Sequence, residues 1–147
     1  MVNILVINGP NLNNLGNRDP KTYGTITLEE INQALKDKSV TLKSNVLCFQ
    51  SNHEGEIVDF IQSSSKKAEG IIINGGALTQ VGYSILDALI DCQLPYVEVH
   101  LSNIYSRENF RQKSVLSANA IGQICGLGIH GYLYGLEHLV KLLAKKN

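Results

Sequence analysis

Short apolar runs alternate with helix-like segments along this chain, and this alternation limits its fold more than any other feature. The runs have the length of buried strands and lie at residues 4–7, 46–49, 71–73, 96–99 and 120–125. Glycine, proline and asparagine dominate residues 8–24, which predicts a long loop after the first strand. Strands that alternate with helices form a parallel sheet with right-handed crossovers.

Four segments carry apolar residues at helical spacing. The first begins at a capping box formed by Thr27 and Glu30, and the second follows candidate caps at residues 51–52. The third is centred on residues 85–90, and a closing helix is predicted over residues 131–146. The pattern as a whole predicts an α/β fold: a flavodoxin-like, doubly wound five-stranded parallel sheet with helices on both faces.

Length and charge restrict the domain organisation and the partners. A chain of 147 residues fits a single domain, residues 1–147. Lys and Arg together number 13, as do Asp and Glu, so charge gives no reason to expect nucleic acid or an anionic membrane as a partner. The near-zero net charge does permit self-association, because little repulsion opposes it.

Targeting signals and cysteine usage both favour a cytoplasmic protein. No apolar run approaches the ~20 residues of a membrane span, and the first run is too short and lacks a basic flank for a signal peptide. Cys48, Cys92 and Cys125 are widely spaced and lie in apolar stretches. We therefore expect buried reduced thiols and no zinc site or other metal site.

Doubly wound folds bind ligands in the crevice outside the carboxyl ends of their strands. The loops that begin at Asn8, Gln50, Asn74 and His100 should therefore converge on one crevice. These loops are also the richest in polar and ionisable residues. We predict the functional site there.

A glycine motif near the end of the chain imitates a dinucleotide-binding site. Residues 126–131 fit Gly-x-Gly-x-x-Gly, but such a site also needs a following strand with an acidic residue ~20 positions on. A helix is predicted after the motif, and no such strand follows it in the sequence. We therefore expect a tight turn with close helix packing, and a nucleotide or flavin carrier rests on fold analogy alone.

Arg18 and Tyr23 in the first loop are candidates for a catalytic base. A free phenol is a poor base at neutral pH, but a guanidinium within ~4–6 Å favours the phenolate by Coulomb attraction. Gly16 and Gly24 flank the pair and would let residues 16–24 move as a lid. The alternative is a plain solvated loop.

Polar residues also end the third and fourth predicted strands. Asn74 is placed to hydrogen-bond a ligand hydroxyl. Strand alternation puts Glu98 and His100 on the same side, where a carboxylate orients an imidazole and favours its protonated form, as a general acid requires. The alternative is a satisfied structural pair. His53 more often has a structural or rim role in such a position.

Arg107, Arg111 and Lys113 form a basic group in the polar stretch of residues 102–114. The two arginines are four residues apart, the spacing of one helical turn, and could bind a carboxylate or hydroxyls together with the lysine. A solvated turn is the alternative.

Taken together, these segments resemble the type II 3-dehydroquinate dehydratases over nearly the whole chain and in the expected order. The matching pieces are Asn8-Gly9-Pro10-Asn11-Leu12-Asn13 with Leu15-Gly16, Arg18-Asp19-Pro20 with Tyr23-Gly24, Gln50 to Gly55, Ile72-Ile73-Asn74, Glu98-Val99-His100-Leu101-Ser102-Asn103-Ile104, Arg107-Glu108 with Phe110-Arg111, and Gly126-Leu127-Gly128 with Gly131-Tyr132.

The resemblance implies a cofactor-free anti elimination that converts 3-dehydroquinate to 3-dehydroshikimate in the shikimate pathway of aromatic amino acid biosynthesis. Tyr23, activated by Arg18, would take a proton from the carbon beside the ketone. An enolate would form, stabilised by a water that Asn11 helps to hold. His100, oriented by Glu98, would then protonate the departing hydroxyl.

The resemblance also implies a small-molecule carboxylate substrate and a homo-oligomer of trimers assembled into a dodecamer. Ser102 and the backbone at Leu101 would bind the substrate carboxylate, while Asn74 and Arg111 would hold ring hydroxyls. Asp87 matches a family residue that reaches into a neighbouring subunit's site.

One patch departs from the family pattern. After Thr79 the family usually has His-Thr-Ser and, a few residues on, Arg-Asp, whereas this chain has Gln80-Val81-Gly82 and then Leu86-Asp87. Gln80 replaces a usual substrate contact, and its amide can donate a hydrogen bond but cannot titrate. Gly75 also stands where proline is common. The alternative hypothesis is therefore a catalytically weakened small-molecule binding protein on the same fold.

Overall fold

Five parallel strands form one sheet, in the order β2-β1-β3-β4-β5. The computed structural model describes residues 1–145, and in it the strands are β1 (Val2–Asn8), β2 (Ser44–Gln50), β3 (Gly70–Asn74), β4 (Tyr96–His100) and β5 (Gly122–Cys125). The predicted fold class and all five strands are confirmed. The last strand starts two residues later than predicted, because Ala120 closes a short turn by donating its N–H to the Ser117 carbonyl.

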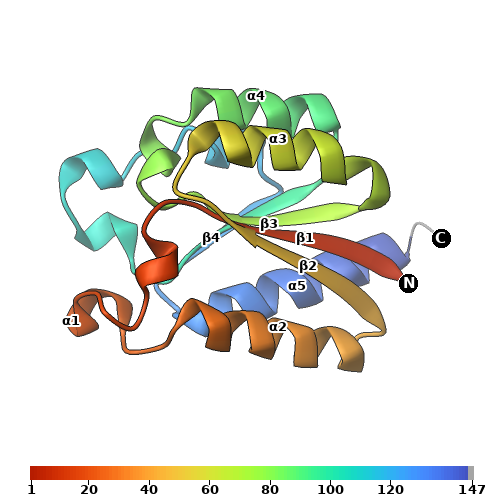
Figure 1. Ribbon diagram of the computed structural model, residues 1–147, viewed down its shortest axis with the longest axis horizontal. Helices are drawn as coiled ribbons and strands as arrows, with labels where there is room; N and C mark the ends of the chain where they lie inside the picture. Colours follow the sequence, from red (N-terminus) through yellow and green to blue (C-terminus); the bar gives the residue numbers. More distant parts are fainter. Residues whose placement is uncertain (146–147) are drawn as a thin grey trace.

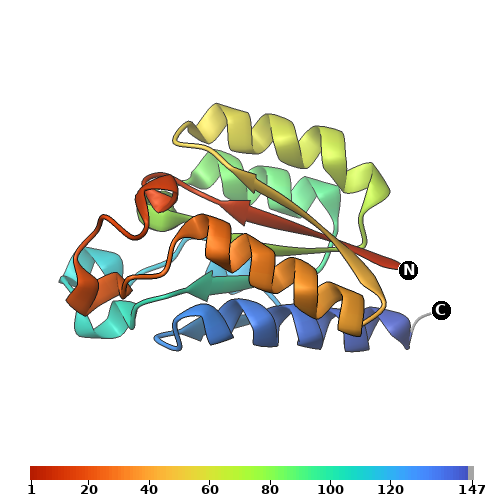
Figure 2. The same ribbon diagram turned by 60° about the horizontal axis from the view of Figure 1, so that its bottom comes forward.

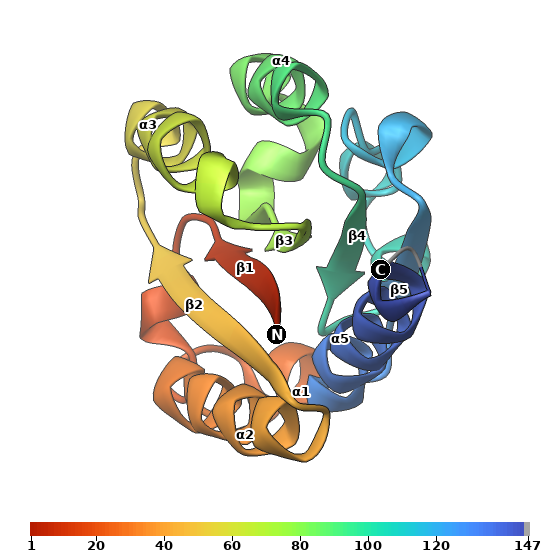
Figure 3. The ribbon, with the colours of Figure 1, turned by 90° about the vertical axis from the view of Figure 1, so that its right-hand side faces the viewer.

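Two helices cover each face of the sheet (Figures 1 and 3). Helices α3 (Glu54–Ser64) and α4 (Tyr83–Cys92) lie on one face, and α2 (Leu28–Thr41) and α5 (Ile129–Ala144) lie on the other. A further short helix, α1 (Pro20–Tyr23), interrupts the predicted loop after β1. Figure 2 shows α2 and α5 side by side beneath the strands.

The inner strand β1, between β2 and β3, divides its side chains between two cores. Ile4 and Val6 pack against α2 and α5, whereas Leu5 and Ile7 pack against α3 and α4. Both faces of the strand are buried, and for this reason its sequence is a continuous apolar run without alternation. Buried polar side chains gather at the carboxyl ends of the strands, at Asn8, Asn74, Glu98 and His100.

The predicted start of α2 is confirmed, whereas the caps predicted for α3 are not observed. The capping box of α2 is confirmed: Glu30 N–H donates to Thr27 Oγ1 at 3.2 Å, and Thr27 N–H donates to Glu30 Oε2 at 3.1 Å. The predicted caps of α3 at Ser51 and Asn52 are wrong, because α3 begins after His53 without a side-chain cap. Asn52 instead accepts a hydrogen bond from Asn11 N–H in another loop, at 3.0 Å.

The glycine motif at residues 126–131 forms a tight turn and a close helix contact, as predicted. Gly126 has φ of 83°, a left-handed conformation that favours glycine. A Cβ atom at Gly131 would lie 3.2 Å from Val99 of β4, so the glycine lets α5 approach the sheet. Helix α5 starts at Ile129, two residues before the predicted start, and predicted helical residue 146 lies outside the described residues.

Cys48, Cys92 and Cys125 are free, but each is only partly buried, so the prediction of full burial is wrong. Cys48 lies on the edge strand β2 and Cys125 on the edge strand β5, where helices cover the sheet incompletely. Burial raises the pKa of the Cys48 thiol, and burial together with the charge of Glu98 raises that of Cys125 to about 11. Among residues 1–145, no helix has the length and apolar character needed to span a membrane.

Candidate active site

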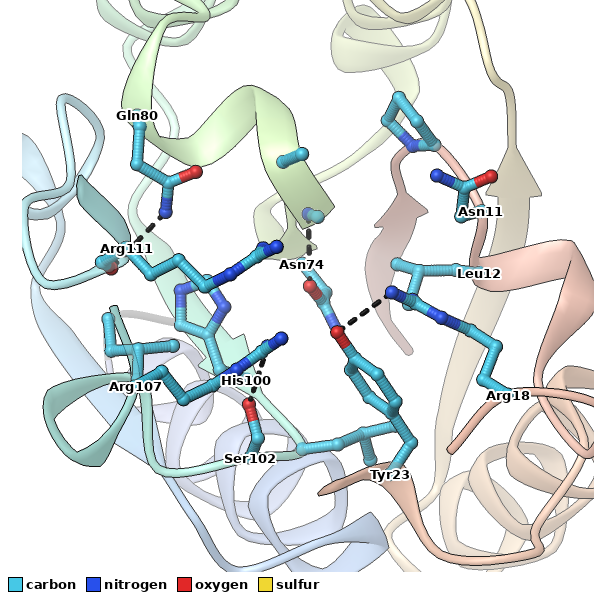
Figure 4. Close-up of a pocket in the computed structure, with 15 residues that line it drawn as sticks. Asn11, Leu12, Arg18, Tyr23, Asn74, Gln80, His100, Ser102, Arg107 and Arg111 are labelled. Carbon is cyan, nitrogen blue, oxygen red and sulfur yellow. Dashed lines mark hydrogen bonds between the residues drawn. The ribbon is translucent and has the colours of Figure 1, made fainter. Parts of the chain in front are cut away.

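A pocket opens at the carboxyl ends of β1, β3 and β4, and the segment that carries α1 forms one side of it (Figure 4). The loop after β1 contributes Pro10, Asn11, Leu12, Arg18 and Tyr23; the loop after β3 contributes Asn74, Gly76, Ala77 and Gln80; and β4 with its following loop contributes His100, Leu101, Ser102, Ile104, Arg107 and Arg111. Three of the four loops predicted to converge therefore line one pocket.

The loop after β2 supports the pocket from behind and does not line it. Gln50 Nε2 donates to the Gly9 carbonyl at 3.2 Å, and Asn52 accepts from Asn11 N–H. Asn11 itself has φ of 67°, in the left-handed region. Gly9 packs so closely on the loop after β3 that a Cβ atom there would lie 2.3 Å from the Gly75 carbonyl oxygen. Backbone contact thus holds two walls of the pocket together.

Arg18 and Tyr23 lie together at one side of the pocket (Figure 4). Arg18 Nη2 donates to the Tyr23 hydroxyl at 2.7 Å, and the guanidinium carbon lies 3.8 Å from the centre of the phenol ring. Asp19 brings this about, because it accepts from Lys21 N–H at 3.1 Å and starts the single helical turn that ends at Tyr23. The sequence-predicted pair is therefore in direct contact.

Arg107 brings a second guanidinium to the same phenol. Its guanidinium carbon lies 5.1 Å from the centre of the Tyr23 ring, and its Nη1 donates to Ser102 Oγ at 3.4 Å. The phenol of Tyr23 therefore lies close to two positively charged side chains. The sequence pattern predicts Arg107 only as a binder of carboxylate or hydroxyl groups, because no local pattern links it to Tyr23.

Glu98 and His100 form a buried pair at the end of β4, with 2.9 Å between Glu98 Oε2 and His100 Nε2. Ser114 and Gln123 also donate to the Glu98 carboxylate. Burial raises the pKa of Glu98, but the hydrogen bonds from these three side chains outweigh it and hold the pKa below its ordinary value. The carboxylate is therefore charged at neutral pH, and His100 Nδ1 is the ring nitrogen left for a ligand.

Asn74 is held by a network that the sequence analysis missed. Its Oδ1 accepts from Gly76 N–H at 3.2 Å, and its Nδ2 donates to the Tyr132 hydroxyl at 2.8 Å. The fully buried Tyr132 of α5 in turn donates to Asn8 Oδ1 at 2.6 Å. These bonds fix the orientation of the Asn74 amide and leave one N–H of Nδ2 for the pocket.

Gln80 and Arg111 meet at the opposite side of the pocket from Arg18 (Figure 4). Gln80 Nε2 donates to the Arg111 carbonyl at 3.3 Å, which leaves Oε1 free to accept a hydrogen bond. Arg111 Nε donates to Glu108 Oε2 at 2.7 Å. Arg107 and Arg111 lie in separate short turns, so the predicted helical spacing between them is wrong, although both line the pocket.

Four of the residues considered above lie away from the pocket. Glu98 lies behind His100 and touches the pocket through it. Asp87 is exposed on α4 and does not line the pocket of its own chain. His53 and Lys113 are exposed and also lie outside the lining.

The pocket has a positive lining. Arg18, Arg107 and Arg111 are part of it, and none of its lining residues is Asp or Glu. Such a lining suits an anionic ligand, and guanidinium groups bind carboxylates with two parallel hydrogen bonds. Within the part of the chain that the structure describes, no group of three or more His, Cys, Asp and Glu side chains is arranged to hold a metal ion.

A family model and known proteins match this chain over nearly its whole length. The model of the family described as "Dehydroquinase class II" matches residues 2–140. The 3-dehydroquinate dehydratase of Halothermothrix orenii is 52% identical over 145 residues, which cover 99% of this chain and 98% of the relative. That of Endomicrobium trichonymphae is 56% identical over 143 residues, which cover 97% of this chain and all of the relative.

Solved structures agree with these matches. The type II dehydroquinase of Butyrivibrio crossotus has a TM-score of 0.91 and 42% identity, covering 94% of this chain and 97% of its own. That of Propionibacterium acnes has a TM-score of 0.91 and 38% identity, covering 96% of this chain and 97% of its own. A 3-dehydroquinate dehydratase-like protein from Bifidobacterium longum is more distant, with a TM-score of 0.73 and 29% identity over 97% of this chain and 98% of its own.

Proposed function

Because the chain belongs to the class II dehydroquinase family, we propose that it dehydrates 3-dehydroquinate to 3-dehydroshikimate in the shikimate pathway. The reaction removes a proton from the carbon beside a ketone and a hydroxyl from the next carbon. It therefore needs a base, a site for the developing oxyanion and an acid. The pocket offers candidates for all three.

Tyr23 is the proposed base. Its hydroxyl is 2.7 Å from Arg18 Nη2, and Arg107 adds a second guanidinium near the ring, so a negative charge on the phenol oxygen would lie beside two positive groups. The phenolate takes the proton from carbon, and the electron pair of the broken C–H bond moves to the ketone oxygen. The product of this step is an enolate.

Asn11 is proposed to help hold a water that stabilises the enolate oxygen. It lines the pocket on the Arg18 side, and its backbone N–H is already bonded to Asn52, so its side chain is the part available to a ligand or water (Figure 4). A preorganised hydrogen bond to a developing oxyanion stabilises the transition state more than the ground state.

His100 is the proposed acid. The enolate collapses, the bond between carbon and the hydroxyl oxygen breaks, and the imidazolium donates its proton so that water leaves. Glu98 is charged and bonded to Nε2, which holds the ring in place and directs Nδ1 to the pocket. Tyr23 and His100 lie on different walls of the pocket, as an anti elimination requires (Figure 4).

The remaining polar groups are proposed to bind the substrate. Ser102 and the backbone at Leu101 hold its carboxylate, and Asn74 and Arg111 hold ring hydroxyls. Gln80 accepts a hydrogen bond from a hydroxyl through Oε1, because Nε2 is engaged by the Arg111 carbonyl. The chemistry needs no metal or cofactor, since every proton and electron pair is accounted for by the substrate and these side chains.

The enzyme is further proposed to assemble as trimers that form a dodecamer, with Asp87 directed to a neighbouring subunit's site. Two observations support this. Asp87 is exposed on α4, and apolar side chains are exposed on the same helix and next to it, at Ile90, Tyr83 and Val81. Such side chains are commonly covered in oligomers.

One observation carries the proposal: a guanidinium-bonded phenol and a carboxylate-bonded imidazole line the same pocket. The test is an absorbance assay that follows the formation of 3-dehydroshikimate, whose conjugated double bonds absorb light, from 3-dehydroquinate. Tyr23→Phe should reduce kcat by about 10²–10⁴-fold, because a positioned base contributes about this much and the phenyl ring cannot replace it. Chelators should leave the wild-type rate unchanged. Full activity in Tyr23→Phe would reject the assigned base.

Gln80 supports one alternative, a binding protein with weakened catalysis. The family usually has histidine at this position, and glutamine cannot titrate. The same assay decides between the two functions, since this alternative requires saturable binding of 3-dehydroquinate with no dehydrated product.

A further inference from the structure

Gln123 of β5 binds the carboxylate that orients the proposed acid. Its Nε2 donates to Glu98 Oε2, the same oxygen that faces His100 Nε2, while Ser114 Oγ donates to Glu98 Oε1. A carboxylate with donors on both oxygens cannot rotate without losing one of them. Gln123 therefore contributes to the direction in which Glu98 presents its charge to His100.

Tyr105 and Glu98 together hold the Gln123 amide in one orientation. The Tyr105 hydroxyl donates to Gln123 Oε1 at 2.6 Å, and a phenolic O–H can do this only to the carbonyl end of the amide. The Nε2 end is thereby turned to Glu98. The opposite orientation would point the amide carbonyl at a charged carboxylate and would leave the Tyr105 hydroxyl facing N–H groups.

We propose that Tyr105 and Gln123 are positioning residues for His100, acting through Glu98 in the order Tyr105, Gln123, Glu98, His100. Tyr105 and Gln123 do not line the pocket, and the side chain of Tyr105 is 55% exposed. If removal of the Tyr105 hydroxyl lowers activity, the effect must reach His100 through the hydrogen bonds of Gln123 and Glu98. The kinetic part of this inference rests on the proposed function.

The charge of Glu98 acts on its other neighbours as well. Burial and then the charge of Glu98 raise the pKa of Tyr96 to about 12 and that of Cys125 to about 11. These two groups and His100 are the titratable groups around the carboxylate on β4 and β5. Tyr96 and Cys125 are both neutral at physiological pH, so neither competes with His100 for the charge of Glu98.

The first test is a double-mutant cycle with Gln123→Met, Tyr105→Phe and the double variant. Methionine keeps the length of the side chain but cannot donate to Glu98. Gln123→Met should lower kcat about tenfold with KM within twofold, because a misplaced acid loses part of its contribution of about 10²–10⁴. Tyr105→Phe should lower kcat about threefold, and the double variant should match Gln123→Met alone.

Tyr134→Phe is the matched control, since it removes the hydroxyl of another exposed tyrosine that is not bonded to Gln123. It should leave kcat unchanged. If Gln123→Met does not fold, as judged by its thermal midpoint, Tyr105→Phe alone still tests the network. An unchanged kcat in Tyr105→Phe, or an equal loss in the presence and absence of Gln123, would overturn the proposal.

A second readout does not depend on turnover. The imidazole N–H that His100 shares with Glu98 should give a downfield proton resonance, assigned by its absence in His100→Asn. Its exchange with solvent should be at least threefold faster in Gln123→Met and Tyr105→Phe, and unchanged in Tyr134→Phe. If wild-type protein does not dehydrate 3-dehydroquinate, the proposed function fails while this measurement still decides the network. Equal exchange rates in all four proteins would refute it.

Discussion

Glu98 is a buried carboxylate that stays charged because three side chains donate hydrogen bonds to it. Transfer of an unpaired carboxylate into a protein interior is costly, and Glu98 avoids this cost only through His100, Ser114 and Gln123. The pKa of Glu98 is therefore lower in the folded protein than in the unfolded chain, in spite of burial. This difference links the stability of the protein to pH.

Acid should weaken the contribution of Glu98 to stability. A group whose pKa is lowered by folding stabilises the protein above its unfolded pKa, here about 4.5, and loses this effect as pH falls through the folded value. At pH 7, Glu98→Gln should reduce the free energy of unfolding by about 1–3 kcal/mol, the range for a buried hydrogen bond to a charged group. Urea denaturation at pH 7 and pH 3.5 checks this, since the difference should shrink at the lower pH. An equal difference at both pH values would contradict it.

Gln80 should contribute to substrate binding rather than to the chemical step. Its Oε1 is free to accept from a substrate hydroxyl, and a lost hydrogen bond of about 1.4 kcal/mol corresponds to a tenfold change in affinity. Gln80→Leu should therefore raise KM about tenfold and change kcat less than threefold, measured by steady-state kinetics. Gln80→His, the usual family residue, is the control and should keep KM low. A change in kcat alone would argue against this role.

Among the secondary-structure elements, the single turn of α1 matters most for the site, because it returns Tyr23 to Arg18. Asp19 starts the turn by accepting hydrogen bonds from Lys21 N–H and from Thr22 Oγ1, the latter at 2.7 Å. The bond from Thr22, followed by that from Lys21, holds the pKa of Asp19 below its ordinary value. A helix this short has little stability of its own and depends on its cap.

Asp19→Ala should loosen α1. We expect faster amide hydrogen exchange at residues 21–24 and a three- to tenfold lower kcat/KM, because Tyr23 is less well placed against Arg18. Hydrogen exchange followed by mass spectrometry, together with kinetics, measures both effects. Asp59→Ala, at an exposed position of α3, is the matched control and should change neither. Unchanged exchange in Asp19→Ala would show that α1 is held by other contacts.

In the molecule as a whole, parallel strand order brings distant segments to one edge. β1, β3 and β4 are neighbours in the sheet, so the segments that follow Asn8, Asn74 and His100 meet although they are far apart in the chain. The same arrangement leaves Asp87 on the outer surface of α4. A role for Asp87 in catalysis therefore requires a second copy of the chain.

The wild-type protein should assemble in solution. Light scattering after size-exclusion chromatography should give about 190 kDa, twelve times the 16.1 kDa of one chain. Asp87→Ala should keep this mass and raise KM about threefold or more, because the change removes a charge supplied to a neighbouring site. Asp91→Ala, one turn further along α4, is the control for a surface change. A fully active monomer would contradict the proposed assembly and the role of Asp87 together.

Sequence patterns were sufficient for the fold class and for part of the site. Periodicity and capping are local, so the strands, the start of α2 and the pairing of Glu98 with His100 could be predicted from neighbouring residues. The prediction that Asn52 caps α3 was wrong, because its side chain instead accepts a hydrogen bond from the backbone N–H of Asn11, 41 residues away. A hydrogen-bond partner that is brought close only by tertiary packing cannot be predicted from neighbouring residues.

The sequence alone was enough to predict the α/β alternation and three of the loops that line the pocket, because these depend on residues close together in the chain. Folding in three dimensions decided the rest: Arg107 beside Tyr23, Tyr132 beside Asn74, and Gln123 beside Glu98. Each of these contacts joins segments that are distant in sequence and depends on strand order and side-chain packing. No periodicity or motif predicts such a contact, because the residues around each partner fit a helix, strand or loop whether or not the contact forms.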